Sequence, residues 1–504
     1  MEPEDGFVSG VVFNDRNGDG VRGRFEFGIR GVAVSNGRDV ARTDWNGRYR
    51  LPIDGEAIIF VVKPAGFATA MGENRLPHFY YIHKPDGSPE NLRFAGVPQT
   101  GPLPRSVDFP LTRQRESDRF DVLLFGDPQP YTTKEVDFLA HDIVDELIGS
   151  EAAFGITLGD IVGDDLSLFE AVNRVVSQVG IPWYSIPGNH DMNYLAESDL
   201  HADESFERVY GPGTYAFEYG PVHFVMLDDV VFGGPVIGGS VSQNYAGGLS
   251  SDQLAFLHNY LEDVPRDHLV VVAMHIPLQG TVPQLDVPER RELFAILEDH
   301  PHNLSIAAHM HTQGHRFFGE SDGYGGPEPH HQLIQGTTSG SWWLGTPDEL
   351  GIPDAMMRDG TPNGYSILRL DGNDYSIRYK VARRPADYQM NISAPDVIDA
   401  DAAEATEILV NVFAGSERTH VKMRLGRTGE WVRLDRVERP APYFVEQKRR
   451  EGNGPRPLPP ADPSSHLWAG NIPAETGRGT WTLEVRATDM FGRTDTAYRT
   501  LRVR

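Results

Sequence analysis

Five short apolar segments, each followed closely by Asp, Asn, Gln or His, constrain the fold of this 504-residue chain most strongly. The segments are residues 120–125, 153–158, 183–186, 269–274 and 304–308. Short apolar runs bounded by Gly and Pro predict buried parallel strands. Ligands bind beyond the carboxyl ends of strands in open α/β sheets, so we expect the polar side chains to meet at one edge.

The polar residues at the strand ends are oxygen and nitrogen donors. They are Asp127, Gln129, Asp160, Asp164, Asn189, His190, Asp191, His275, His309 and His311. Such donors suit two divalent cations. His309 and His311 are two positions apart, which on an extended segment points both imidazoles to one side, one toward each ion.

The order of the motifs resembles a known family. The motifs read Gly126-Asp127-Pro128-Gln129, Gly159-Asp160-Ile161-Val162-Gly163-Asp164, Gly188-Asn189-His190-Asp191, Met274-His275-Ile276 and Ala308-His309-Met310-His311. Together they resemble the calcineurin-like metallophosphoesterases. That resemblance implies a central α/β/β/α sandwich and hydrolysis of a phosphate ester by a hydroxide that bridges two metal ions. The sequence departs from the family pattern at Gln129, where the family has His, and at Ala308, where it has Gly.

The resemblance also implies a role for each matching residue. The first ion would be held by Asp127, Gln129, Asp160 and His311, and the second by Asp160, Asn189, His275 and His309. Asp160 would bridge the two ions. His190 would act as the general acid or as a partner of a phosphate oxygen, with Asp164 fixing its tautomer. Because an amide oxygen is a harder and weaker ligand than imidazole, Gln129 favours Mn, Fe(II) or Mg over Zn, although the identity of the metals stays open.

Residues 1–115 predict an N-terminal all-β domain followed by an irregular linker from residue 66. The expected strands are residues 7–13, 32–35, 49–52, 57–63 and 107–111. Alternating apolar residues separated by turns favour a sandwich, and the motifs around Asp15 and Asp44 resemble small B-type, transthyretin-like modules of surface proteins. The aromatic run at 78–83 would line a cleft or cover the sheet.

The N-terminal region also contains a candidate calcium site. Asp15, Asn17, Asp19 and Glu26 follow the spacing of an EF-hand loop. The flanking helices of an EF-hand are missing, so the alternative is a solvated turn that needs no ion.

Residues 116–384 predict the phosphoesterase domain, with helices at 134–148, 166–179 and 250–261. The glycine-rich loop at 230–248 contains Tyr245, a candidate substrate-binding residue. Side chains alternate along a strand, so one of the adjacent Trp342 and Trp343 is expected to be exposed. Either tryptophan is a candidate for binding substrate, and packing between domains is the alternative.

Residues 385–504 predict a C-terminal all-β domain similar to an immunoglobulin-like sandwich. Six expected strands, around 397 and at 407–413, 420–425, 431–436, 480–487 and 497–503, are interrupted by a Pro-rich span at 439–463. With three such parts, the chain resembles a bacterial branch of the superfamily. Residues 464–468 resemble the C-terminal sequence of that branch and suggest no chemistry.

The composition limits the partners of the chain. The formal net charge is -26, and residues 385–504 contain 17 Lys+Arg and 17 Asp+Glu, so the acidic excess lies before residue 385. An acidic surface argues against nucleic-acid binding. The chain has no cysteine and no apolar stretch long enough to span a membrane. Its first residues are no signal peptide, yet the resemblance of the flanking domains to surface modules favours a periplasmic or extracellular protein whose leader is absent. A cytoplasmic protein with this natural start is the alternative.

The sequence therefore predicts dinuclear-metal-dependent hydrolysis of a phosphate ester, with a phosphodiester favoured over a monoester. A small-molecule or cell-envelope phosphate ester would suit the flanking domains. Two alternatives remain open: a catalytically silent, metal-binding surface protein and a Ser/Thr protein phosphatase. The sequence does not determine the oligomeric state.

Overall fold

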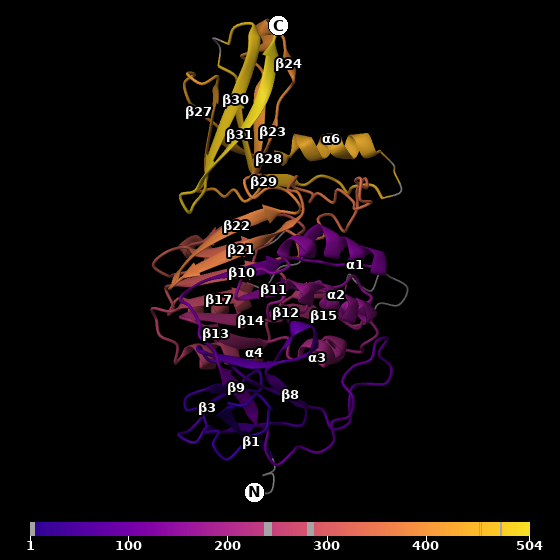
Figure 1. Cartoon of the computed structure of the whole chain (residues 1–504), viewed down its shortest axis with the longest axis vertical. Coiled ribbons are helices and arrows are strands. Elements are labelled where there is room, and N and C mark those ends of the chain that lie inside the picture. Colours follow the sequence, from indigo (N-terminus) through magenta and orange to yellow (C-terminus); the bar gives the residue numbers. More distant parts are fainter. Residues whose placement is uncertain (1–5, 236–243, 280–286, 453, 455, 474–475) are drawn as a thin grey trace.

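Three units follow one another along the long axis of the molecule, and the N-terminal and C-terminal units lie at opposite poles (Figure 1). The computed structural model describes residues 6–235, 244–279, 287–452, 454, 456–473 and 476–504. The outer two units are rich in strands, and the central one contains both helices and strands. No helix in these ranges is long and apolar enough to cross a membrane.

Two sheets build the N-terminal unit. The first contains, in spatial order, β4 (Arg48–Pro52), β1 (Phe7–Asn14), β9 (Phe109–Arg113), β6 (Phe67–Met71) and β7 (Pro77–His78). The second contains β3 (Val40–Arg42), β2 (Ala33–Ser35), β5 (Ala57–Val61) and β8 (Tyr80–His83). The five expected strands are confirmed, with shifts of up to two residues at their ends.

The prediction of an irregular linker from residue 66 was wrong for residues 67–83, which contribute β6, β7 and β8 to the two sheets. The aromatic run at 78–83 contains β8 and helps to cover the core. Phe79 is buried, and its ring centroid lies 4.8 Å from that of Tyr215 in the central unit.

The central unit contains two larger sheets. The first has the order β12 (Trp183–Ile186), β11 (Phe154–Leu158), β10 (Arg119–Phe125), β21 (Gly364–Asp371) and β22 (Asp374–Val381). The second has the order β13 (Tyr215–Tyr219), β14 (Val222–Met226), β17 (Leu269–Ala273), β18 (Asn303–Ala307), β20 (His330–Ile334) and β19 (Gly314–Phe318). All five strands that precede the polar motifs are parallel to a neighbour, as predicted.

Helices cover both outer faces of this pair of sheets. Leu123 and Phe125 face outward from β10 and pack with α1 (Thr133–Leu139) and α2 (Phe169–Val176). The second sheet packs with α4 (Ser251–Leu261) and α5 (Val287–Leu297). The layers are therefore α/β/β/α. Each of the three predicted helices is present, and Ser250 forms a capping box with Gln253 at the start of α4.

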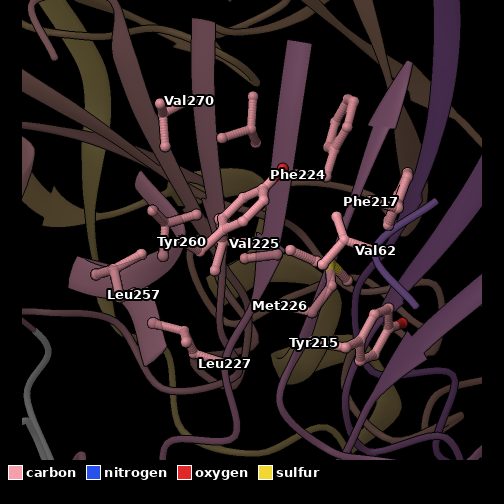
Figure 2. Packing of buried hydrophobic residues seen from close by; sticks show 14 of the residues in the cluster. Val62, Tyr215, Phe217, Phe224, Val225, Met226, Leu227, Leu257, Tyr260 and Val270 are labelled. Atoms are coloured by element: carbon pink, nitrogen blue, oxygen red, sulfur yellow. The ribbon is translucent and has the colours of Figure 1, made fainter. Parts of the chain in front are cut away.

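Aromatic side chains fill the space between the two sheets (Figure 2). The Phe217 ring is stacked 3.9 Å from Tyr184 and 5.0 Å from Phe224, measured between ring centroids. Each fully buried side chain of this size contributes roughly 2–3 kcal/mol through the hydrophobic effect. This core fixes the distance between the two sheets whose strand ends carry the polar motifs.

The N-terminal unit is joined to the same core. Val62 lies among its residues (Figure 2), and the Phe60 ring is 5.5 Å from Phe256 of α4. Lys63 Nζ forms a buried ion pair with Glu116 at 2.7 Å and donates to the Glu218 carbonyl oxygen at 2.6 Å. These contacts make the first two units one packed body.

The C-terminal unit consists of two sheets around their own core. One contains β23 (Met390–Ser393), β25 (Glu407–Val412), β29 (Pro463–Asn471) and β28 (Asp435–Pro440). The other contains β24 (Val397–Ile398), β31 (Thr494–Val503), β30 (Gly479–Thr488), β26 (His420–Leu425) and β27 (Val432–Arg433).

All six expected strand positions in the C-terminal unit hold strands, but the Pro-rich span is not irregular throughout. It contains helix α6 (Pro442–Glu451), with Pro442 in the first turn. Proline suits that position because its fixed φ is helical and its missing N–H would have no helical partner.

Candidate metal centre

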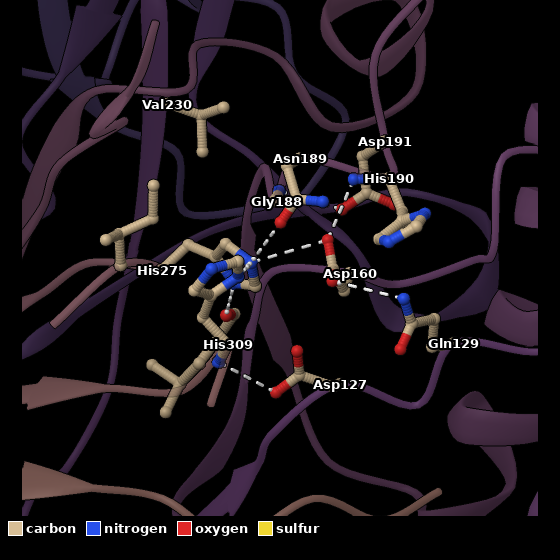
Figure 3. Close-up of polar contacts among 12 residues, drawn as sticks. Asp127, Gln129, Asp160, Gly188, Asn189, His190, Asp191, Val230, His275 and His309 are labelled. Atoms are coloured by element: carbon tan, nitrogen blue, oxygen red, sulfur yellow. Dashed lines mark hydrogen bonds and ion pairs between the residues drawn. The ribbon is translucent and has the colours of Figure 1, made fainter. Parts of the chain in front are cut away.

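The predicted polar side chains meet at one edge of the central sandwich, although their strands belong to two sheets. β10, β11 and β12 of the first sheet lead into the turns that carry Asp127, Asp160 and Asn189. β17 and β18 of the second sheet lead to His275 and His309. Figure 3 shows these five residues turned toward one another.

Most of the turns at this edge have a backbone conformation that L-residues rarely adopt. Asp127, Gln129, Asp160, Asp164, His309 and His311 have φ between 38° and 68°. With Trp342 and Trp343, they are eight of the eleven non-glycine residues with positive φ in the described ranges. Each such residue costs roughly 1–3 kcal/mol. The concentration of strain at one place indicates a functional site.

Four donors surround one position at this edge. His275 Nε2 lies 3.1 Å from Asn189 Oδ1, 3.1 Å from His309 Nδ1 and 3.4 Å from Asp160 Oδ1. The ligand atoms of Asp160, His275 and His309 all lie within 4.8 Å of one another. The spacing is that of groups that can share one cation.

Hydrogen bonds and burial favour the neutral form of the imidazoles at the site. His275 donates from Nδ1 to the Leu158 carbonyl oxygen at 2.8 Å, and His311 from Nδ1 to Gly340 O at 2.6 Å. Each therefore directs the lone pair of Nε2 into the site. Burial lowers the pKa of His311 to about 3. Burial, with the neighbouring His275, likewise lowers the pKa of His309 to about 3.

A second set of donors lies on the other side of Asp160. Asp127 Oδ1 and Gln129 Oε1 are fully buried and have no hydrogen-bond partner, and His311 Nε2 is 3.8 Å from Asp127 Oδ1. Asp160 faces both sets, because Oδ1 lies toward His275 while Oδ2 is 3.3 Å from Gln129 Nε2. Burial and the Asp160 charge raise the pKa of Asp127 well above its usual value.

These observations fit divalent cations. Burying two acceptors without partners, beside two carboxylates, costs folding free energy unless a cation is bound. The side chains also supply the hard and borderline oxygen and nitrogen atoms that divalent ions prefer. In the described ranges, the only other group of three or more carboxylates or imidazoles close enough to hold an ion is Asp15, Asp19 and Glu26, in the N-terminal unit.

His190 lies on the more accessible side of the site, where its side chain is 16% exposed. Its Nδ1 is 2.6 Å from Asp164 Oδ1, and the Tyr194 hydroxyl donates to the same oxygen at 2.9 Å. Burial lowers the pKa of His190, but the carboxylates of Asp160 and Asp164 outweigh it and raise the pKa to about 9. Nε2 is thus left as a proton donor facing away from Asp164.

Two buried carboxylates hold the loops of the site in place. Asp191 accepts the backbone N–H groups of Ile161, Val162 and Gly188 at 2.9–3.1 Å. Asp229 accepts those of His275 and Ile276. Asp229 is not among the residues expected from the sequence; its signal is the Asp228-Asp229 pair that follows the largely apolar run at 222–227, a pattern similar to that of the recognised motifs.

The two adjacent tryptophans, Trp342 and Trp343, differ in burial. Both lie in a turn rather than a strand, with φ of 55° and 53°. Trp343 is fully buried and donates from Nε1 to Pro128 O at 2.8 Å, so its assignment as a substrate-binding candidate was wrong. Trp342 is half-buried and stacked on the His311 ring, 4.2 Å between centroids. Tyr245 is also half-buried, with its hydroxyl 3.4 Å from His309 Nε2.

The carboxylates of the candidate calcium site accept hydrogen bonds from backbone N–H groups of their own loop. Asp15 accepts the N–H groups of Gly18 and Gly20, and Glu26 accepts those of Arg16 and Gly23. Asp19 accepts the N–H of Val21, and Asn17 donates to Asp19. The geometry supports the alternative, a turn held by its own carboxylates, and gives calcium no support.

The C-terminal unit reaches the loop that follows His311. Asp359 Oδ2 accepts the backbone N–H of Gln313 at 2.8 Å, and His466 Nε2 of β29 lies 3.0 Å from the same oxygen. The Gln313 side chain in turn accepts the N–H of Gly336 at 2.6 Å. His466 thus has a structural role that no local pattern predicts, because the contact spans 107 residues.

Comparisons with known proteins agree with the order of the three units. Three family models match: N terminal of calcineurin-like phosphoesterase at residues 16–99, calcineurin-like phosphoesterase at 120–313, and C terminal of calcineurin-like phosphoesterase at 332–494. No curated protein matches the chain.

Two solved structures show some likeness to the chain. Purple acid phosphatase PPD1 from yellow lupin (Lupinus luteus) seeds is 10% identical, with a TM-score of 0.37. That match covers 74% of this chain and 66% of the lupin chain, so this chain spans just under two thirds of the lupin protein. CopC from Methylosinus trichosporium OB3b is 14% identical over 22% of this chain and 88% of that one, with a TM-score of 0.14.

Proposed function

Since the chain is a calcineurin-like phosphoesterase, a metal-binding hydrolase of phosphoric esters with the family's N-terminal and C-terminal modules, we propose that it hydrolyses a phosphodiester with two divalent ions. The arrangement around Asp160 carries this proposal. One of its oxygens lies toward His275, and the other lies 3.3 Å from Gln129 Nε2. A carboxylate between two donor sets would suit a pair of divalent cations.

Each donor set would hold one ion. Asp127, Gln129, Asp160 and His311 form the first set, and Asp160, Asn189, His275 and His309 form the second. In the second set, the hydrogen bonds leave Nε2 of His275 and Nδ1 of His309 as the ligating atoms. Bound divalent ions supply Lewis acidity, which polarises phosphate oxygens and makes water more acidic.

The remaining residues handle the proton and the orientation of the substrate. His190 is held by Asp164 through Nδ1, so Nε2–H is free to donate to a phosphate oxygen or to the departing alkoxide. Tyr194 bonds to Asp164 and keeps that carboxylate oriented. Positioned general acids typically contribute 10²–10⁴-fold to the rate.

Aromatic residues on the two sides of the site favour a diester with an organic group. Trp342 flanks His311 and Tyr245 flanks His309, and both are half-buried. Their apolar faces would bind the part of the substrate that a phosphomonoester lacks. In the native setting, we propose a small-molecule or cell-envelope phosphate ester.

The test is hydrolysis of bis-(p-nitrophenyl) phosphate and p-nitrophenyl phosphate by metal-stripped protein, with Mn, Fe(II), Zn, Mg and Ni restored in turn. We expect metal-dependent turnover, faster for the diester. His190→Ala should lower kcat by roughly 10²–10⁴-fold without releasing metal. His258→Ala, at an exposed position of α4, is the matched control and should behave as wild type.

Each proposal has an outcome that contradicts it. Two bound ions without turnover of either ester would favour a silent metal-binding protein, although the intact His190–Asp164 pair argues against that alternative. Faster turnover of the monoester would overturn the diester assignment. Turnover that survives in His190→Ala would remove His190 from the chemistry.

A further inference from the structure

Four large apolar side chains of the N-terminal unit are exposed to solvent instead of joining a core. Val21, Phe25, Phe27 and Trp45 are 68%, 69%, 70% and 76% exposed. Exposed aromatic residues gathered in one place usually mark an interaction site.

The two segments that carry these side chains are in contact. Gly28, next to Phe27, approaches the Asn46 carbonyl so closely that an added Cβ would lie 1.8 Å from the oxygen. The Arg30 guanidinium carbon lies 3.3 Å from the centroid of the Trp45 ring. Residues 16–30 and 44–48 therefore form one surface, here called the aromatic patch.

The aromatic patch is held rigid from within. Asp15 and Glu26 are buried, and each accepts two backbone N–H groups of the loop between them. Although burial opposes it, the N–H groups of Gly20 and Gly18 hold the pKa of Asp15 below its usual value. A loop fixed in this way presents its apolar side chains without an ordering cost on binding.

The charge of the aromatic patch is opposite to that of the chain. It contains five arginines (16, 22, 24, 30 and 48) and three acidic residues, of which Glu26 is buried, whereas the whole chain has a net charge of -26. Arg24 lies over the Phe25 ring at 5.7 Å, as Arg30 lies over Trp45. This alternation of guanidinium and aromatic groups fits an anionic surface with an apolar interior.

We propose that the aromatic patch binds the surface of an anionic lipid bilayer. Phe25, Phe27 and Trp45 enter at the level of the headgroups, and the arginines face the lipid phosphates. Four side chains projecting from two loops are too few for a stable protein interface, which buries about 800 Å² on each partner. A bilayer requires no complementary shape. This inference is independent of the proposed phosphodiester chemistry.

The test is flotation of the full chain with vesicles of phosphatidylglycerol and phosphatidylcholine, compared with phosphatidylcholine alone. We expect flotation only with phosphatidylglycerol, weakened by salt. The triple variant Phe25→Ser, Phe27→Ser, Trp45→Ser should lower the partition coefficient at least tenfold, on the order expected for lost interfacial burial. The control is Tyr498→Ser, because Tyr498 is 66% exposed in the C-terminal unit.

A second set of variants tests the charge. Arg22→Gln, Arg24→Gln and Arg30→Gln together should lower the partition coefficient roughly a hundredfold, at about fivefold per arginine near the surface. Arg174→Gln with Arg266→Gln, at two exposed arginines of the central unit, is the control. The midpoint of thermal unfolding should be unchanged in every variant, which verifies folding.

Three results would overturn the proposal. The first is wild-type protein that stays at the bottom of the gradient with phosphatidylglycerol vesicles. The second is an equal loss of flotation in Tyr498→Ser, which would make the binding nonspecific. The third is capture of the wild type by soluble dextran sulfate without flotation, which would assign the aromatic patch to an anionic polymer.

Discussion

His466 of the C-terminal unit and Asp359 of the central unit form a buried pair, 3.0 Å between Nε2 and Oδ2, behind the loop that carries His311. The same carboxylate oxygen accepts the backbone N–H of Gln313, two residues beyond His311. The C-terminal unit thus helps to fix one side of the candidate metal centre.

Removing His466 should therefore affect both stability and metal binding. His466→Ala removes the imidazole from the buried Asp359 carboxylate and leaves it with backbone N–H donors alone, which should cost about 1–3 kcal/mol of unfolding free energy. We also expect weaker binding of the ion next to His311, measured by metal titration. His420→Ala, an exposed position in the same unit, should change neither quantity. Lower stability with unchanged metal affinity would show that the pair has no role at the site.

Asp203 and Asp228 should make the protein less stable as the pH rises. Burial raises the pKa of Asp228 to about 7, and burial with the Asp228 charge raises that of Asp203 well above its usual value. Because the pKa is raised on folding, the stabilising contribution is fully present below about pH 4 and is lost as the pH rises toward 7.

Asp228→Asn removes one titrating carboxyl from this pair. At pH 8 the variant should be more stable than wild type, by on the order of 3 kcal/mol, and the gain should vanish near pH 4. Urea unfolding at both pH values measures the difference. Glu151→Gln, at an exposed carboxylate, is the control and should show no such gain. Equal effects at pH 4 and pH 8 would contradict the raised pKa of Asp228.

Gln129 should control the affinity and the identity of one of two ions. Gln129→Ala removes a buried acceptor that has no other partner, so we expect at least a roughly tenfold loss of affinity for one ion while the other is retained. Gln129→His should shift the preference of that ion toward Zn, because imidazole is a softer ligand. Elemental analysis after dialysis against mixed metals measures both the number of bound ions and their identity. Gln178→Ala, at an exposed position, is the control. Unchanged metal content in Gln129→Ala would exclude ligation by Gln129.

Substitution of Trp343 should lower the stability of the protein, whereas substitution of Trp342 should weaken substrate binding. Trp343→Ala removes a fully buried side chain and its bond to Pro128 O, so it should cost about 3–5 kcal/mol of unfolding free energy. Trp342→Ala should cost little stability but should raise KM for the diester, because its exposed face lies beside His311. Thermal unfolding and steady-state kinetics distinguish the two, and a KM change in Trp343→Ala alone would reverse the assignment.

Local patterns predicted most elements and the convergence of the strand-end residues. The run at 120–125 and the turn to Asp127 are adjacent in the chain, so backbone periodicity and turn chemistry were enough to predict them. They were not enough to predict the strands that follow residue 66 or the contact between His466 and Asp359. Phe79 is buried by Tyr215, and His466 contacts Asp359, at separations of more than a hundred residues.

The sequence by itself determined most of the strands, the order of the polar motifs and the kinds of donor atom, because these depend on neighbouring residues. Only the tertiary structure decided which two sheets bring those donors together, which tryptophan is buried, and how the outer units contact the central one. It also decided that Asp15 and Glu26 hold a loop instead of leaving their oxygens free. The reason is physical: burial and hydrogen-bond satisfaction are set by whatever packs against a residue, and that neighbour is usually distant in the chain.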